Sequence, residues 1–187
     1  MTRLLLCAID GALVETGTTN PLPGVRERLR ALRAQGVAVA VVTNQGGVGC
    51  RYAHEQRGDR RQAARYPTLD DVRARLAAVA AELPITHIYM CLHHGRRGWP
   101  IPEDLSIAET DSPAPMRWSW RLAWRKPQPG MLMQALQDLG IGADDALMVG
   151  NRSEDQEAAG TMEVEFRWGN DFFAESLFQD PRQTGES

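Results

Sequence analysis

Short, continuous runs of apolar residues alternate along this chain with segments of helical periodicity, and this alternation restricts the available folds more than any other feature. Such runs occur at residues 4–9, 37–42 and 146–149, and each ends in a polar or glycine-containing stretch. A strand that is apolar at every position is buried on both faces of its sheet. Strands that alternate with helices form a parallel sheet through right-handed crossovers. We therefore predict an α/β fold with a doubly wound parallel sheet of about five strands.

The remaining elements follow from the same patterns. We expect further strands at residues 85–91 and 162–168, and helices that start near residue 25, span 130–139 and include 158–160. The spacing Thr68-x-x-Asp71 predicts a capping box at the start of another helix. Weak periodicity predicts loop excursions at 50–67 and 92–124. These elements predict one domain over residues 1–179, followed by a polar C-terminal tail at 180–187.

Composition narrows the class of protein. Hydrophobic residues make up 43% and charged residues 24% of the 187 residues, and the net charge is −3. These values are typical of a globular domain and give no overall basic field for nucleic acid. The three cysteines (Cys7, Cys50 and Cys91) form no C-x-x-C pair, which favours a reducing compartment. Since no apolar run is long enough for a signal peptide or a membrane span, we expect a soluble cytoplasmic protein.

Polar side chains follow the predicted strands at the places where parallel sheets bind ligands. Asp10 follows the first run, Thr43 the second and Asn151 the run at 146–149. Ligands of open α/β sheets bind beyond the carboxyl ends of the strands. Four segments carry most of these residues: 8–13 (A-I-D-G-A-L), 42–49 (V-T-N-Q-G-G-V-G), 125–131 (R-K-P-Q-P-G-M) and 150–155 (G-N-R-S-E-D).

In this order, the four segments resemble the four motifs of the haloacid dehalogenase-like (HAD) phosphohydrolases, over residues 4 to about 168. The patterns T-N-Q-x-G-V and R-K-P-x-x-G-M are similar to those of one branch of the family. That branch contains the histidinol-phosphate, heptose bisphosphate and polynucleotide 3′-phosphatases. The resemblance implies a HAD-like Rossmannoid fold. It also implies phosphoryl transfer through an aspartyl-phosphate, with Mg²⁺ between the phosphate and the protein. Only one helix and one strand separate the first two motifs, so we expect no large cap domain.

Carried over residue by residue, the resemblance assigns a role to each motif position. Asp10 takes the general acid/base position, and Thr43, Asn44 and Lys126 take the phosphate-binding positions, with Thr43 and Lys126 also counted as catalytic. The metal positions fall on Asp10, through its backbone carbonyl, and on Asn151 and Asp155. The resemblance implies a weak Mg²⁺ site, because Mg²⁺ prefers carboxylates and two of them are replaced by a methyl group and an amide.

The nucleophile position carries Ala8, which has no heteroatom. Ala12 and Asn151 also depart from the motif residues, a Thr and an acid respectively. Without a carboxylate at position 8 no aspartyl-phosphate can form, so the resemblance implies a phosphatase scaffold that is inactive or severely impaired. Two origins stay open, an engineered knock-out and a natural pseudophosphatase. The departure of three residues from the motifs favours a natural loss of activity, because an engineered knock-out normally changes one residue.

A zinc site is not expected. The heptose bisphosphate branch carries a C-x-H half-site and a C-x-C half-site. Cys91 and His93 match the first, but the second falls on Leu122 and Trp124, which cannot bind zinc. Because the second zinc half-site is absent, we expect a phosphomonoester other than heptose bisphosphate as the ligand. A nucleic-acid end is one candidate.

A second function is also compatible with the sequence. The segment 95–125 carries four of the five tryptophans (Trp99, Trp118, Trp120 and Trp124) and five arginines against four acids. Aromatics interleaved with arginines can stack on bases and pair with phosphates. The chain could then be a non-catalytic protein that uses this loop to bind a protein or nucleic acid. The alternative is a loop that packs its tryptophans onto the sheet edge. Two interpretations are equally compatible with the arginine-rich segment 50–67. It could attract a polyanionic substrate towards the site, or it could be a solvated surface.

Overall fold

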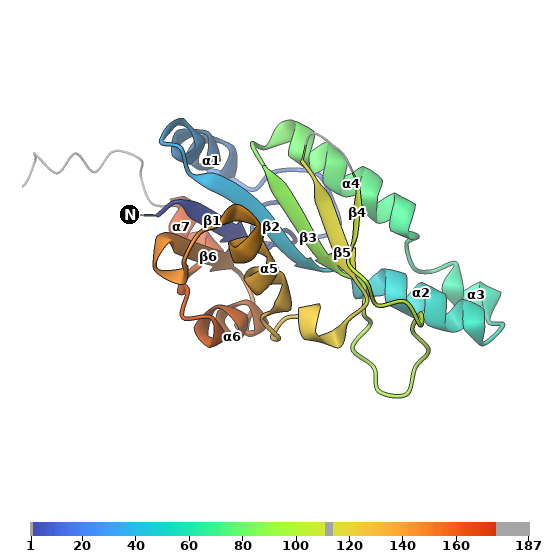
Figure 1. The fold of residues 1–187 in the computed structure, drawn as a ribbon. Helices are drawn as coiled ribbons and strands as arrows, with labels where there is room; N and C mark the ends of the chain where they lie inside the picture. The colour runs from blue at the N-terminus through green and yellow to red at the C-terminus, as the bar shows by residue number, and fades with distance from the viewer. Residues whose placement is uncertain (1, 111–113, 175–187) are drawn as a thin grey trace, which may run out of the picture.

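The computed structural model describes residues 2–110 and 114–174, and these residues form one α/β unit (Figure 1). The predicted tail at 180–187 and the last residues of the predicted domain lie outside this range, as does Asp111 of the tryptophan-containing segment.

A seven-stranded sheet forms the centre of the molecule, in the order β4-β5-β3-β2-β1-β6-β7. All neighbouring pairs are parallel except β4 and β5, which pair in antiparallel fashion at one edge. The prediction of a doubly wound, mainly parallel sheet is therefore confirmed, with two strands more than expected. The strands are β1 (Leu4–Cys7), β2 (Ala38–Asn44), β3 (His87–Cys91), β4 (Ala108–Thr110), β5 (Met116–Ser119), β6 (Ala146–Gly150) and β7 (Glu165–Trp168).

Helices cover both faces of the sheet (Figure 1). One face packs against α1 (Val25–Ala34) and α4 (Leu69–Glu82), and the other against α5 (Gly130–Leu139) and α6 (Ser153–Thr161). The remaining helical elements are α2 (Gly46–Gln56), α3 (Arg60–Ala63), α7 (Gly169–Ala174) and the short 3₁₀ turns η1 (Leu122–Trp124) and η2 (Ala143–Asp145). Among the described residues, the connection between β1 and β2 holds only α1, so no large cap lies there.

The helix starts and ends follow local sequence chemistry. Thr68 accepts a hydrogen bond from the Asp71 amide at 3.0 Å, and the Asp71 carboxylate accepts one from the Thr68 amide at 2.8 Å. This is the predicted capping box of α4. The helix α5 ends at Gly140, whose left-handed φ of 60° suits glycine.

The segment 92–124 is not one long loop, as predicted, because it contains β4, β5 and η1. Both strands lie near the sheet edge, where one side of a strand can be polar. Glu109 and Arg117 occupy such positions and pair with each other at 3.1 Å. A strand of three or four residues with charged side chains carries no apolar run, so its sequence resembles a loop.

The segment 50–67 also differs from the prediction of a loop, because α2 and α3 occupy most of it. The sequence pattern does not predict α2, because glycines occupy its first turn and glycine disfavours helical interiors. Gly49 is required there by packing: a β-carbon on it would collide with the backbone of Leu92 and His94. Among the described residues, no helix is both long enough and apolar enough to cross a membrane.

Candidate functional site

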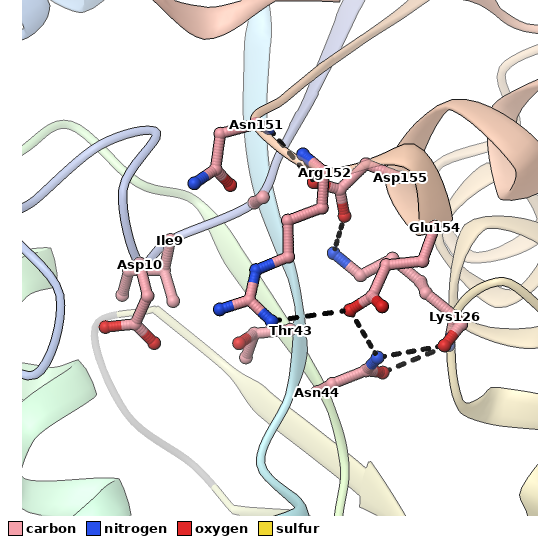
Figure 2. A pocket seen from close by; sticks show the side chains of 10 residues that line it. Ile9, Asp10, Thr43, Asn44, Lys126, Asn151, Arg152, Glu154 and Asp155 are labelled. Carbon is pink, nitrogen blue, oxygen red and sulfur yellow. Dashed lines mark hydrogen bonds and ion pairs between the residues drawn. The ribbon is translucent and has the colours of Figure 1, made fainter.

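A small pocket of about 60 Å³ opens at the carboxyl edge of the sheet, where β1, β2 and β6 end (Figure 2). Every residue to which the motifs assigned a role lines this pocket: Ala8, Asp10, Thr43, Asn44, Lys126, Asn151 and Asp155. The structure therefore brings together segments that are more than 140 residues apart in sequence. Ile9, Arg152 and Glu154 complete the lining.

Ala8 lies directly after β1, at the base of the pocket. Its amide donates a hydrogen bond to the Val149 carbonyl at 2.9 Å, which fixes it beside the end of β6. The residue is 5% exposed and belongs to the apolar cluster under α5 and α6. Residue 8, to which the motif resemblance assigns the nucleophile position, thus lines the pocket and presents only a methyl group.

A buried ion pair joins Lys126 to Asp155 across the pocket. The two side-chain atoms, Nζ and Oδ1, lie 2.6 Å apart, and the residues are 4% and 1% exposed. The same ammonium donates to the Val42 carbonyl at 2.8 Å. The other carboxylate oxygen of Asp155 accepts the amides of Asn151 and Arg152, each at 3.1 Å. This pairing satisfies both charges and ties the start of α6 to the segment before α5.

Asn44 and Thr43 form the wall of the pocket at the end of β2. Asn44 exchanges two hydrogen bonds with the backbone of Lys126, both at 3.0 Å, so its amide group serves to position the lysine segment. The Thr43 hydroxyl accepts a hydrogen bond from the Gln45 side-chain amide at 2.9 Å. Because a hydroxyl is both donor and acceptor, Thr43 keeps its own proton available for a ligand oxygen.

The Asp10 carboxylate turns away from Lys126 and towards α4 (Figure 2). Arg75 of α4 binds both of its oxygens, at 2.7 and 3.0 Å, and the Gly17 amide donates to one of them at 2.9 Å. Burial alone would raise the pKa of Asp10. The hydrogen bonds from Arg75 and Gly17 outweigh burial, and the pKa lies below its ordinary value of 3.8. Asp10 is therefore held as an anion whose charge is already paired.

The donor set fits a divalent cation poorly. Mg²⁺ binds oxygen ligands and favours carboxylates. In this pocket position 8 offers a methyl group and Asn151 offers an amide, while the carboxylate of Asp155 is bound by Lys126. Across the described residues, no cluster of three or more His, Cys, Asp or Glu side chains could hold a metal ion. The chain's own residues thus do not form the carboxylate site that the motifs imply.

Sequence reasoning missed three charged residues at this site. Arg152 and Glu154 lie within the fourth motif segment, so their motif neighbours could have indicated them. Arg75 could not have been found, because it lies 65 residues from Asp10 on the exposed side of a helical pattern.

A larger cleft of about 360 Å³ adjoins the pocket and shares Asp10 and Arg152 with it. Residues from the connection after β1 and from α4 line most of it: Thr16, Gly17, Gln45, Pro67, Asp71, Val72 and Arg75. Its volume is in the range that small-molecule sites use.

The zinc half-site residues have other partners in this structure. The Nδ1 atom of His93 accepts the Gly95 amide at 2.8 Å, and the Cys91 thiol contacts the Arg121 carbonyl at 3.6 Å. Burial raises the pKa of this thiol to about 11, which disfavours the thiolate that binds zinc. At the second half-site, Leu122 is exposed and Trp124 is buried.

The tryptophans of the segment 95–125 are engaged within the molecule. Trp99 contacts two guanidinium groups, those of Arg57 and Arg96, at 4.4 and 4.3 Å from its ring centre. Trp118 contacts Arg73, Trp120 contacts Tyr52, and Trp124 is buried. These contacts favour the interpretation that the loop packs its aromatic side chains onto the domain.

Comparisons with known proteins agree with the motifs. A family model described as HAD-hydrolase-like matches residues 123–166. Two curated relatives are D-glycero-beta-D-manno-heptose-1,7-bisphosphate 7-phosphatases. The one from Yersinia pestis is 32% identical over 74% of this chain, and the one from Haemophilus influenzae is 28% identical over 73%. The alignments cover only 60% of the length of each relative.

A solved structure extends the likeness to the whole fold. It is a D,D-heptose 1,7-bisphosphate phosphatase from B. bronchiseptica complexed with magnesium and phosphate. It matches 96% of this chain and 89% of its own, with a TM-score of 0.61 at 18% identity. The matching family model and the curated relatives support the HAD superfamily, and the relatives point to its heptose bisphosphate phosphatase branch.

Proposed function

We propose that this chain is a HAD-type phosphatase domain that binds the phosphate group of a phosphomonoester without hydrolysing it. The observation that carries the proposal is the position of Ala8, whose methyl group lines the same pocket as Thr43 and Lys126. A methyl group cannot attack phosphorus, so the covalent intermediate of the family cannot form in this pocket. The groups that would hold a phosphate, by contrast, remain in place.

A second feature supports the loss of turnover. The family's reaction needs a proton donor for the leaving oxygen, and the motif resemblance assigns Asp10 to that position. In this chain Asp10 is paired with Arg75 and turned towards the second cleft. Both carboxylates of the first motif are thus absent or engaged elsewhere.

The adjoining cleft suggests where the rest of the ligand would lie. A phosphate in the small pocket would leave its ester group facing the 360 Å³ cleft, because the two spaces share Asp10 and Arg152. The relatives are named for sugar bisphosphates, which favours a sugar phosphate as the first ligand to test. A nucleic-acid end stays a prediction. No contact among the described residues favours the second function, binding through the tryptophan loop.

Release of inorganic phosphate from p-nitrophenyl phosphate tests this proposal. With Mg²⁺ present, the unmodified chain is expected to release no more phosphate than an equal concentration of an unrelated protein. The matched variants are Ala8→Asp and Ala8→Asp/Asn151→Asp, which return the two missing carboxylates. Activity regained in either variant assigns the loss to these residues and favours a recent or engineered knock-out. No regain indicates a scaffold committed to binding. Robust turnover by the unmodified chain would contradict the proposal.

A further inference from the structure

The carboxylates that would attract a cation to the pocket are already bound to basic side chains. Asp155 is paired with Lys126 at 2.6 Å and Asp10 with Arg75 at 2.7 Å. Among the described residues that line the pocket, Glu154 is the one other acid; its side chain is 34% exposed, pairs with Arg152 at 3.8 Å and accepts a hydrogen bond from Asn44 at 3.5 Å. A single partly exposed carboxylate is a weak ligand set for Mg²⁺.

Arg152 carries a positive charge into the same space. It lines both the small pocket and the larger cleft, and its guanidinium extends from the start of α6 towards Thr43 (Figure 2). Its side chain is 60% exposed, and its Nη1 atom lies 3.8 Å from the Glu154 carboxylate. The two groups form an ion pair, but the separation is too long for a hydrogen bond, so the guanidinium keeps its donors available for a ligand.

Lys126 alone is a limited anion ligand in this arrangement. An ammonium group has three donors, and two of them are used by the Val42 carbonyl and by Asp155. A guanidinium, by contrast, presents a planar fork that matches two phosphate oxygens at once. The larger share of the positive charge that faces a bound phosphate would therefore come from Arg152.

We propose that the pocket binds a phosphate group without a divalent cation, and that the Arg152 guanidinium supplies the charge that Mg²⁺ supplies in the family. This inference rests on the proposed phosphate-binding function and specifies its ligand chemistry. Thr43 and Lys126 would each donate one further hydrogen bond to the same group. Glu154 opposes binding, because its negative charge lies beside the guanidinium.

Titration of the full chain with inorganic phosphate tests the inference, by calorimetry in EDTA and again with Mg²⁺. The unmodified chain is expected to bind equally well in both. Arg152→Gln should weaken binding at least tenfold, Arg152→Lys should weaken it less, and Glu154→Gln should tighten it several-fold. Arg97→Gln is the charge-matched control, since Arg97 is exposed in the loop after β3, and it should leave affinity unchanged.

The possible failures are distinguishable. Two results would overturn this inference and leave the proposed function standing. One is phosphate binding that requires Mg²⁺. The other is binding that persists in an Arg152→Gln variant whose circular dichroism spectrum is unchanged. An unmodified chain that binds no phosphate in either buffer overturns both. An equal loss in Arg152→Gln and Arg97→Gln would show a general charge effect and would also overturn the inference.

Discussion

At the scale of single residues, the buried pair of Lys126 and Asp155 connects the stability of the domain to the geometry of its pocket. Lys126→Met leaves the Asp155 carboxylate buried without its counter-charge, which costs about 3–5 kcal/mol. Lys126→Met/Asp155→Asn should recover most of this loss, because an asparagine oxygen can still accept an amide of Asn151 or Arg152. Urea denaturation measures the free energy of unfolding of each variant.

The control for this pair lies on the surface. Arg3 and Asp145 are 3.9 Å apart, and their side chains are 61% and 38% exposed, so Arg3→Met should change the free energy of unfolding by less than about 0.5 kcal/mol. Equal losses in the single and double Lys126 variants would show that the lysine acts through packing rather than through the charge of Asp155.

At the scale of secondary structure, glycines mark where helices approach their neighbours. Gly49→Ala in α2 should destabilise the domain by about 1–3 kcal/mol, because the new β-carbon meets the backbone of Leu92 and His94. Gly160→Ala in α6 meets nothing within 4 Å and should stabilise it by about 0.5–1 kcal/mol. Thermal denaturation of both variants checks the pair. A stabilised Gly49→Ala protein would mean that α2 does not pack as described.

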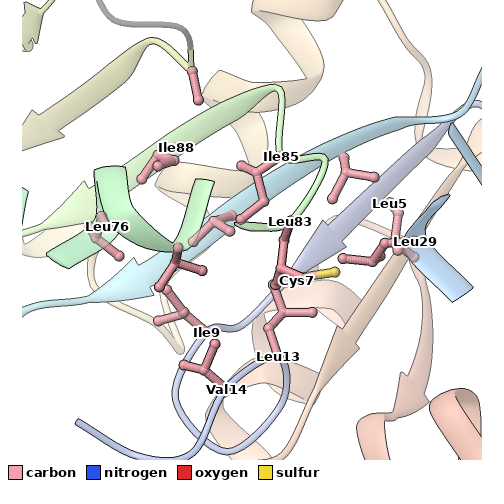
Figure 3. Close-up of a cluster of buried hydrophobic side chains, with 14 of the residues drawn as sticks. Leu5, Cys7, Ile9, Leu13, Val14, Leu29, Leu76, Leu83, Ile85 and Ile88 are labelled. Atoms are coloured by element: carbon pink, nitrogen blue, oxygen red, sulfur yellow. The ribbon is translucent and has the colours of Figure 1, made fainter. Parts of the chain in front are cut away.

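The strands predicted from continuous apolar runs, β1, β2 and β6, lie at the centre of the sheet. Leu5, Cys7 and Ile9 belong to an apolar cluster that includes residues of α1 and α4 on one face (Figure 3), while Leu4 and Leu6 belong to a second cluster with residues of α5 and α6 on the other. Burial on both faces produces continuous apolar runs, which sequence patterns detect. The strands β4 and β5 have no such run, and α2 begins with glycines, so these elements could not be predicted.

The same division holds for the site. The pocket residues from the motifs could be predicted because they lie near the carboxyl ends of β1, β2 and β6 or near the starts of α5 and α6, where a parallel sheet gathers its polar groups. Arg75 could not, since its contact with Asp10 depends on how α4 packs against the connection after β1.

At the scale of the whole molecule, the fold gathers the motif residues around one small pocket, and we propose that this pocket binds a phosphate group without cleaving its ester. The central claim is therefore binding without cleavage, and both halves follow from residues that line one space: Thr43, Lys126 and Arg152 for binding, and Ala8 for the lack of cleavage. Because the two halves depend on different side chains, a substitution at a binding residue should weaken binding without restoring cleavage.

A ³¹P NMR spectrum of a sugar phosphate mixed with the unmodified chain tests both halves at once. The account predicts that the ester resonance broadens or shifts as protein is added, and that no inorganic phosphate signal grows beyond that of a protein-free sample. An ester resonance that stays unchanged at high protein concentration, or a growing inorganic phosphate signal, would contradict it.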